Sequence, residues 1–464
     1  MIKRGSAVML VVVLALSSTG CVHQAPYYRG GHVALLPPAP ATQVDHRLLL
    51  IGDAGDPDPK GEPVLDLLGR HVRLMPDRTT VVFLGDNVYE RGMPDSRPKA
   101  LDAAATAANV ILPNVFDSRS DAERILLAQI QPMRRTSART IFIPGNHDWG
   151  QFEVGGWERV LAQEEFIRVN TLDNVDVAFV PEGGCPGPVS MPLGRQGMLI
   201  MLDTQWWLQY GSKPTPEDNP TNCTNTTEEE VTRALVSQLK VAALQGRWAI
   251  VAGHHPLNSA GAHGGFVDMS KHLFPMRFLR HYLPFYLEWL PLPGLGTFAV
   301  LARRHFSPSP QDASNAKNEH LRRTLRSAMA EAELQSAPAL AYAAGHDHSL
   351  QVFRSGYGPR HALVSGLGSA SRSSVVGATE NTLFAHSHPK HAGFMQVDFL
   401  RNGHVRLSVI EVDEAREGGG GEVFSMMLAD ADTPRDTRPA AKRSGIWSRV
   451  KERAKSTWWG LRTW

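Results

Sequence analysis

The sequence predicts an α/β fold, and two observations carry this prediction. Five short apolar runs each end in a glycine that is followed by aspartate, asparagine or histidine, at 47–53, 80–86, 140–148, 248–255 and 339–348. Continuously apolar runs of this length are typical of strands that are buried on both faces. Helical patterns lie between several of these runs, at 61–75, 121–134, 228–245 and 318–335. Strands that alternate with helices indicate the α/β class.

The pattern changes after the fifth run. Further strand-like segments follow at 350–354, 361–365, 394–399 and 405–412, and they favour a largely antiparallel continuation. We therefore expect one catalytic domain over 45–412. The stretch "EGGGGE" then indicates a flexible break, so we expect a linker over 413–440 and a separate tail over 441–464.

The first residues are typical of a signal for export. Lys3 and Arg4 precede an apolar stretch over 7–16, which is too short to span a membrane. The small residues before Cys21 resemble a bacterial lipoprotein signal, which implies a signal peptide over 1–20, a lipid on Cys21 and a lipid-proximal tether over 21–44. The expected location is the bacterial outer membrane or the periplasmic face of a membrane. The alternatives are an ordinary signal peptide that is cut nearby, or an uncleaved anchor.

Charge and cysteine content narrow the class of partner. Two of the 48 Lys and Arg residues lie in 1–20, which leaves 46 of them against 46 acidic residues. A balanced surface has no strong attraction for nucleic acid, so we expect no nucleic-acid partner. Beyond Cys21 only Cys185 and Cys223 remain. In an oxidising compartment such a pair forms a disulfide, and the alternative is two unrelated free thiols.

The residues at the strand ends have the chemistry of a metal site. Ligands collect outside the carboxyl ends of strands in α/β sheets, and these positions offer carboxylate, imidazole, amide and phenol groups. Such a mixture suits Fe, Mn and Zn. The candidates are Asp53, Asp86, Tyr89, Asn146, His147, His254, His346 and His348.

Five motifs carry a resemblance to a known family. They are "GDAG" (52–55), "GDNVY" (85–89), "GNHD" (145–148), "VAGH" (251–254) and "GHDH" (345–348). In order and wording they resemble the calcineurin-like metallophosphoesterases, and more narrowly the purple acid phosphatases of the short, tartrate-resistant type. The resemblance spans about 45–412, is poor over an insertion at 267–315, and implies a four-layer α/β/β/α sandwich.

The resemblance also implies how two metal ions are held. One ion, Fe(III) in the family, would be bound by Asp53, Asp86, Tyr89 and His348. The second, divalent ion, which is Fe, Zn or Mn, would be bound by Asp86, Asn146, His254 and His346. Asp86 would bridge the two ions, and a Tyr89 phenolate on Fe(III) would give the family's purple colour.

The implied activity is the hydrolysis of phosphorylated small molecules. A metal-bound hydroxide would attack a phosphate monoester, as in an acid phosphatase. His147 would bind phosphate or protonate the leaving group, and His263 is the second candidate acid, unless it is a loop histidine without a role. We expect His255 to be a rim or supporting residue rather than a ligand, and Asp148 to orient its neighbours or to be a plain turn residue.

Two other functions stay open at this stage. A phosphodiesterase or a nucleotide pyrophosphatase would use the same core. A protein of another class, a membrane-tethered binding protein with an inactive site, would be marked by a lost ligand, and no motif here has lost one.

Two unusual segments remain. Residues 273–304 are apolar and aromatic, but four prolines interrupt them, so a regular membrane-spanning helix is excluded. Two alternatives remain: a hydrophobic flap, which would lie near the site or near the lipid surface, and a buried cap that packs on the domain. Residues 441–464 carry seven Lys and Arg and one Glu, and an apolar stripe at helical spacing. They predict an interfacial helix on anionic lipid, with a solvated, frayed tail as the alternative.

Overall fold

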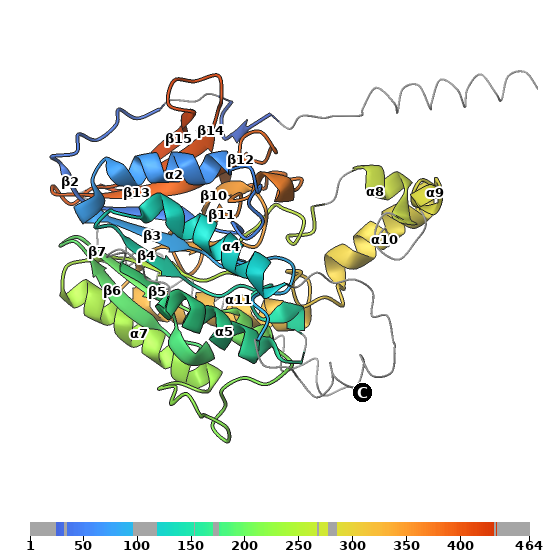
Figure 1. Cartoon of the computed structure of the whole chain (residues 1–464), viewed down its shortest axis with the longest axis horizontal. Coiled ribbons are helices and arrows are strands. Elements are labelled where there is room, and N and C mark those ends of the chain that lie inside the picture. Colours follow the sequence, from blue (N-terminus) through green and yellow to red (C-terminus); the bar gives the residue numbers. More distant parts are fainter. Residues whose placement is uncertain are drawn as a thin grey trace, which may run out of the picture.

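Two β-sheets lie face to face and carry helices on their outer faces in the computed structural model (Figure 1). The structure describes residues 25–31, 35–95, 118–152, 154–169, 176–266, 269–276, 285–430 and 433. The expected signal peptide, Cys21 and the expected tail over 441–464 lie outside the described residues. Within the described part, no helix is long and apolar enough to cross a membrane. The arrangement is the four-layer sandwich that the sequence predicts.

The first sheet has seven strands, and it holds the first three apolar runs side by side. Its order is β15 (Gly420–Ala429), β14 (Val405–Val412), β13 (Gly393–Leu400), β2 (Val44–Ile51), β3 (Thr79–Phe83), β4 (Arg139–Phe142) and β5 (Asp176–Phe179). Strands β2, β3, β4 and β5 run parallel, whereas β13, β14 and β15 are antiparallel to their neighbours.

The second sheet has eight strands, and it holds the fourth and fifth apolar runs. Its order is β1 (Tyr27–Tyr28), β12 (Thr382–His386), β10 (Leu350–Arg354), β11 (His361–Ser365), β9 (Ala339–Ala344), β8 (Trp248–Ala252), β7 (Gly197–Met201) and β6 (Val189–Leu193). Strands β7, β8, β9 and β11 are parallel, and β6, β10, β12 and β1 pair antiparallel.

Helices cover the two outer faces. The first sheet is covered by α2 (Pro63–Arg73), α4 (Arg119–Ile130) and α5 (Gly156–Val169), and the second by α6 (Gln205–Leu208), α7 (Glu228–Leu244) and α11 (Ala316–Leu334). Helix α7 begins at a capping box in which Thr227 and Glu230 satisfy each other's backbone N–H groups. The short 3₁₀ turns are η1 (Pro76–Arg78), η2 (Gln131–Met133), η3 (Gly150–Phe152), η4 (Glu182–Gly184) and η6 (Ala370–Arg372).

Buried apolar side chains hold the layers together. The Phe83 and Phe142 rings stack with centroids 4.5 Å apart in the larger core cluster, which includes residues of both sheets. A second cluster joins α7 and α11 to the outer face of the eight-stranded sheet. Burial of a side chain of this size contributes about 1.5–3 kcal/mol, so the rigid core fixes the strand ends in space.

The predicted strands and helices are present, with one correction at the end of the domain. The sequence predicts a linker over 413–440, whereas β15 adds an antiparallel strand to β14. Gly418 and Gly419 adopt positive φ angles of 83° and 72°. The glycines therefore form the turn of a hairpin rather than a flexible break, because glycine accepts this conformation without strain. Part of the expected tether also packs on the domain, since β1 pairs with β12.

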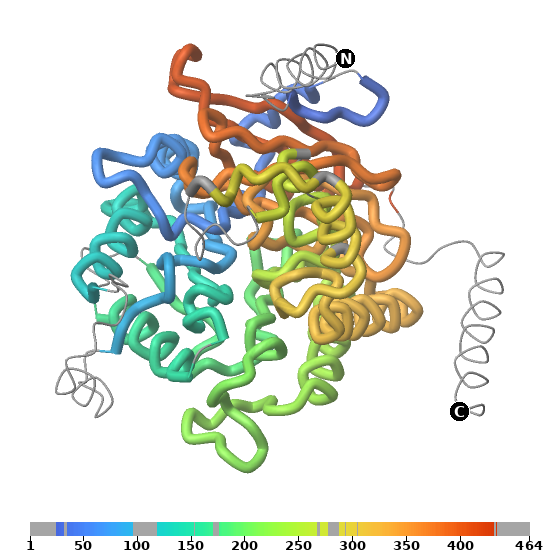
Figure 2. Tube along the Cα trace, turned by 90° about the vertical axis from the view of Figure 1, so that its right-hand side faces the viewer, coloured from blue at the N-terminus to red at the C-terminus, as the bar shows by residue number. Residues whose placement is uncertain are grey.

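The insertion forms a lobe of its own. It contains α8 (Met269–Leu273), α9 (Phe285–Glu288) and α10 (Pro293–His305). Figures 1 and 2 show these helices side by side, projecting from one side of the two-sheet body. Helices α8 and α10 contact each other, and the Leu292 N–H donates to the Leu273 carbonyl at 2.8 Å. The chain then returns to the body through 306–315.

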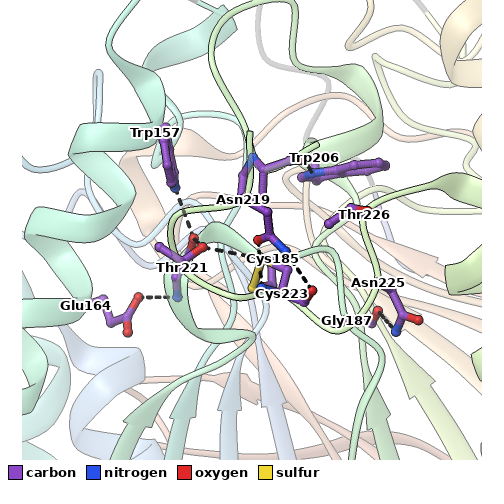
Figure 3. Close-up of a disulfide and its surroundings, with 12 residues drawn as sticks. Trp157, Glu164, Cys185, Gly187, Trp206, Asn219, Thr221, Cys223, Asn225 and Thr226 are labelled. Carbon is purple, nitrogen blue, oxygen red and sulfur yellow. Dashed lines mark hydrogen bonds between the residues drawn. A yellow bond between two sulfur atoms is a disulfide. The ribbon is translucent and has the colours of Figure 1, made fainter. Parts of the chain in front are cut away.

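The two remaining cysteines lie together beneath a polar loop (Figure 3). Their sulfur atoms are at bonding distance, 2.04 Å, although Cys185 and Cys223 are 38 residues apart. Asn219 accepts from the Cys223 N–H at 2.7 Å and donates to the Cys223 carbonyl at 3.0 Å, which fixes the loop around the pair.

Candidate metal centre

Parallel strands from both sheets deliver the predicted ligands to one place. Asp53 follows β2, Asp86 follows β3 and Asn146 lies four residues after β4, while His254 and His346 each lie two residues after β8 and β9. Asp53, Asp86 and His346 have positive φ angles of 59°, 54° and 71°. Non-glycine residues adopt this backbone region rarely and at a cost, and such residues cluster at functional sites.

The first group of ligands surrounds the Tyr89 hydroxyl. That oxygen lies 3.1 Å from Asp53 Oδ1, 3.2 Å from Asp86 Oδ2 and 3.0 Å from His348 Nε2. The ligand atoms of Asp53, Asp86 and His348 all lie within 4.8 Å of one another. These are the four residues expected to hold the first ion.

The second group surrounds the Asn146 side-chain oxygen. His254 Nε2 and His346 Nδ1 each lie 3.0 Å from Asn146 Oδ1 and 3.2 Å from each other. The other oxygen of Asp86, Oδ1, lies 3.3 Å from His254 Nε2. One carboxylate therefore faces both groups, which is the geometry expected of a bridging ligand.

Backbone carbonyls orient three of the imidazole rings. His254 Nδ1 donates to the Leu84 carbonyl at 2.8 Å, His348 Nδ1 to that of Arg372 at 2.8 Å, and His346 Nε2 to that of Gln311 at 2.9 Å. Because those nitrogens carry the hydrogen, the other nitrogen of each ring presents a lone pair to the centre when the ring is neutral. Lone pairs that face one another at these distances fit a cation between them, so the residues fit two metal ions.

Two glycines make this close approach possible. A Cβ atom on Gly85 would lie 2.6 Å from His254 Nδ1, and one on Gly145 would overlap the Asp86 backbone and carboxylate. Both positions therefore exclude any other residue. This is why the glycines precede the ligands in the motifs.

The neighbouring charges shift the pKa values of the ligands strongly. Burial alone would raise the pKa of Asp86 and lower that of His254, but their mutual attraction outweighs burial. The pKa of Asp86 is lowered, and that of His254 is raised to about 9. Burial and the carboxylates of Asp53 and Asp86 raise the pKa of Tyr89 well above its usual range. A phenolate at Tyr89 therefore requires a cation beside it.

Asp148 stabilises the loop that carries Asn146. Its carboxylate accepts from the Gly145 N–H at 2.7 Å and from the Asn87 N–H and side-chain amide at 3.1 Å each. Burial, followed by the charge of Asp86, raises the pKa of Asp148 to about 7. These contacts are those of an orienting residue rather than of a plain turn residue.

His147 lies at the open side of the first group. Its backbone N–H donates to Asp86 Oδ1 at 2.9 Å, and its ring lies 4.3 Å from the Tyr89 ring. Nδ1 hydrogen-bonds with the Glu90 carbonyl at 2.5 Å and lies 2.8 Å from the Gln151 amide. The ring is thereby fixed beside the ligands and partly open to solvent.

His263 lies on the side of the second group. Its ring centroid is 4.2 Å from that of His346, and Nδ1 donates to Asp312 Oδ1 at 3.0 Å. Asp347 accepts from the His263 backbone N–H at 2.9 Å and also binds the Ser259 hydroxyl, so it holds this loop in place. The sequence assigned no role to Asp347, and Asp312 lies in the insertion, where it identified no site residue.

Of the two positions expected for His255, the structure contradicts the one at the rim. The side chain is buried, so it does not lie at the rim. Nδ1 lies 2.9 Å from the Thr204 hydroxyl, and Nε2 has no hydrogen-bond partner among the described residues. Its ring is 5.0 Å from His254 and 4.6 Å from His346, and one of its nitrogens belongs to their group of possible ligands. His255 therefore supports the second group from behind.

Arg372 is a further residue that the sequence did not indicate. Its guanidinium carbon lies 4.0 Å above the Tyr89 ring, and it pairs with Asp56 at 2.9 Å and with Glu90. The cation stacks on the ring whose hydroxyl belongs to the first group. Nothing in the local sequence around Arg372 signals this contact.

Comparisons with known proteins agree with this arrangement at the level of the family. The profile of the calcineurin-like phosphoesterases matches residues 46–284, just over half of the chain. No curated protein sequence matches.

Among the solved structures that are similar to this chain, three illustrate the low level of identity. GAP50, the anchor in the inner membrane complex of Plasmodium, is 15% identical, with 86% of this chain and 93% of that chain covered and a TM-score of 0.48. A dimetal phosphatase from Danio rerio is 13% identical; the match covers 83% of this chain and 99% of that chain, with a TM-score of 0.38. A 5′-nucleotidase precursor from Thermus thermophilus is 10% identical; the match covers 82% of this chain and 53% of that chain, with a TM-score of 0.30. This chain thus spans about half the length of the nucleotidase precursor.

Proposed function

The chain belongs to the calcineurin-like phosphoesterase family, and from this premise we propose that it hydrolyses phosphate monoesters of small molecules with two metal ions. The observation that carries the proposal is the position of Asp86. One oxygen of its carboxylate faces Tyr89 and the other faces His254. A single anion between two sets of lone pairs supports a dinuclear site.

The two ligand groups differ in chemistry, and we assign the ions accordingly. The group of Asp53, Asp86, Tyr89 and His348 contains a phenol and suits Fe(III), while that of Asp86, Asn146, His254 and His346 suits a divalent Fe, Zn or Mn ion. When bound, such a pair of ions acidifies a water molecule into a nucleophile and neutralises charge on the phosphate.

The protein's own residues position the substrate and move the proton. His147 lies beside the first group, and because Nδ1 already donates to the Glu90 carbonyl, Nε2 donates to a phosphate oxygen only when the ring is protonated. His263 lies beside the second group, with Nδ1 held by Asp312, so its Nε2 is the atom that gives a proton to the leaving oxygen.

The proposal extends to the location of the protein. The sequence of residues 1–21 supports export and a lipid on Cys21. The distance between Cys185 and Cys223 supports a disulfide, which persists in an oxidising compartment such as the bacterial periplasm.

A substrate panel tests the proposed activity. The purified protein, loaded with metal, is given an alkyl monoester, a nitrophenyl monoester, a bis-nitrophenyl diester and a nucleoside diphosphate. We expect the highest kcat/KM for the monoesters, and no turnover after chelation. A preference for the diester or the diphosphate would replace the proposal with a phosphodiesterase or a pyrophosphatase. Two bound ions without turnover of any substrate would indicate a binding protein.

A further inference from the structure

The lobe of α8, α9 and α10 presents large apolar side chains to solvent. Among the described residues, 21 large hydrophobic side chains are exposed, and a third of them lie within residues 287–306. They are Leu287, Trp289, Leu290, Leu295, Phe298, Leu301 and Phe306. Such a concentration marks an interaction site, because isolated exposed apolar residues are common but clusters are not.

Helix α10 shows that the exposure follows from how the helix packs. Gly296 lies against α8, where a Cβ atom would overlap the His272 carbonyl, and Val300 is buried one turn later. Leu295, Phe298 and Leu301 form a row that faces solvent, and Phe298 is 69% exposed. Residues three and four apart share a helix face, so α10 packs through one side and offers a continuous apolar row on another.

The composition of the lobe identifies the chemistry of its partner. Residues 269–306 contain five Lys and Arg residues and one acidic residue, Glu288. Of the five, Arg277 and Arg280 lie outside the described residues, and Arg303 is paired with Asp312. Apolar and aromatic side chains combined with basic charge are typical of a surface that lies in the interface of an anionic bilayer. Interface cores between proteins are instead poor in charged residues. We propose that this lobe docks on the surface of an anionic lipid bilayer.

The docking surface is joined directly to the catalytic site. Arg303, in α10, pairs with Asp312 at 2.9 Å, and Asp312 accepts from His263 at 3.0 Å. The Ser314 hydroxyl also donates to the Arg303 carbonyl at 2.7 Å. A lobe seated on a bilayer would therefore hold the mouth of the site in a fixed orientation to that bilayer. Lipid binding itself does not depend on turnover, so it stands apart from the proposed activity.

Vesicle binding of the full chain tests this proposal. All proteins carry Cys21→Ser, so that an N-terminal lipid does not mask the effect of the lobe. The lobe variant is Leu295→Asn/Phe298→Asn/Leu301→Asn. The control, Leu74→Asn/Val169→Asn/Leu244→Asn, removes three exposed apolar residues elsewhere: Leu74 directly after α2, and the last residues of α5 and α7. We expect the parent and the control to bind phosphatidylglycerol vesicles, and the lobe variant to bind at least tenfold more weakly.

Each other outcome counts against the proposal. Equal vesicle binding by the lobe variant and the control would overturn it, as would equal binding to neutral phosphatidylcholine vesicles. A dimer in the parent that the lobe variant loses, with vesicle binding unchanged, would assign the surface to a second copy of the chain. If the lobe variant unfolds at a lower temperature than the control, the single variant Phe298→Glu is tested in its place. It should also bind phosphatidylglycerol vesicles at least tenfold more weakly than the parent. Turnover of a soluble nitrophenyl phosphate should be equal in all proteins, which separates failed docking from failed catalysis.

Discussion

The side chains of His263 and Asp312 form a hydrogen-bonded pair, with Nδ1 of the imidazole 3.0 Å from Oδ1 of the carboxylate. Arg303 binds the same carboxylate through two nitrogens at 2.9 and 3.0 Å, and the Ser307 hydroxyl donates to it as well. Burial would raise the pKa of Asp312, but His263 and Arg303 lower it, so the carboxylate stays charged. The charged Asp312 carboxylate beside Nδ1 fixes the orientation of the His263 ring.

Asp312 is therefore expected to act as a positioning residue for His263. Asp312→Asn removes the charge but keeps the shape. Turnover of an alkyl phosphate should fall by about tenfold, and that of nitrophenyl phosphate should change little. The kcat values for both substrates check this. An equal loss for both substrates would reduce Asp312 to a structural role.

The loss of turnover in a His263 variant should be larger for substrates whose leaving group needs a proton. His263→Ala should lower alkyl phosphate turnover by about 10²–10⁴-fold, as for a lost general acid. Nitrophenolate leaves without a proton, so the penalty there should be much smaller, and metal content should stay constant. His255→Ala serves as a comparison with mild effects. Equal penalties for both leaving groups in His263→Ala would indicate phosphate binding instead.

The Tyr89 hydroxyl should determine the colour of the protein. If its phenolate binds Fe(III), the oxidised protein shows a visible charge-transfer band that Tyr89→Phe abolishes without loss of the fold. A visible absorption spectrum together with iron analysis checks this. A colourless, active protein that contains two divalent ions would contradict the iron assignment and leave the phosphoesterase site intact.

Metal binding at the second group should depend on pH through His254. Its pKa of about 9 means that the imidazole is protonated at neutral pH before a cation binds. A ligand histidine must be neutral, so each cation displaces a proton below pH 9. Zn²⁺ affinity should therefore rise by up to about tenfold per pH unit and level off above pH 9.

Calorimetric titration in buffers of different ionisation enthalpy measures that released proton. We expect about one proton per Zn²⁺ at pH 7 in the parent protein, and a smaller release in His254→Ala. Zn²⁺ affinity that is flat between pH 6 and pH 8 would contradict the assignment.

The sequence predicts that the candidate ligands gather in one place because of where they lie on the strands. Parallel topology brings Asp53, Asp86 and Asn146 to one edge of the first sheet, and His254 and His346 to one edge of the second. The face-to-face packing of the sheets then joins the two sets.

Contacts that depend on how the loops fold could not be predicted. Asp312 meets His263 only because the insertion returns over the site, 49 residues further along the chain. Arg372 reaches Tyr89 from the turn η6, and no periodicity marks that contact. His255 follows a strand end directly, where sequence does not determine whether the next side chain turns inward or outward. The glycine run at 418–421 fits a flexible break and a hairpin turn equally, and only the pairing of β15 with β14 decides between them.

The central claim is that two ions share Asp86, and the metal stoichiometry of turnover tests it most directly. Chelated protein is titrated with Fe and Zn while monoester hydrolysis and bound metal per chain are followed together. We predict that activity appears fully only at two ions per chain. Asp86→Ala should bind less than one ion and lose several orders of magnitude in kcat. Full activity with one ion, or near-normal turnover with both ions bound in Asp86→Ala, would contradict the account.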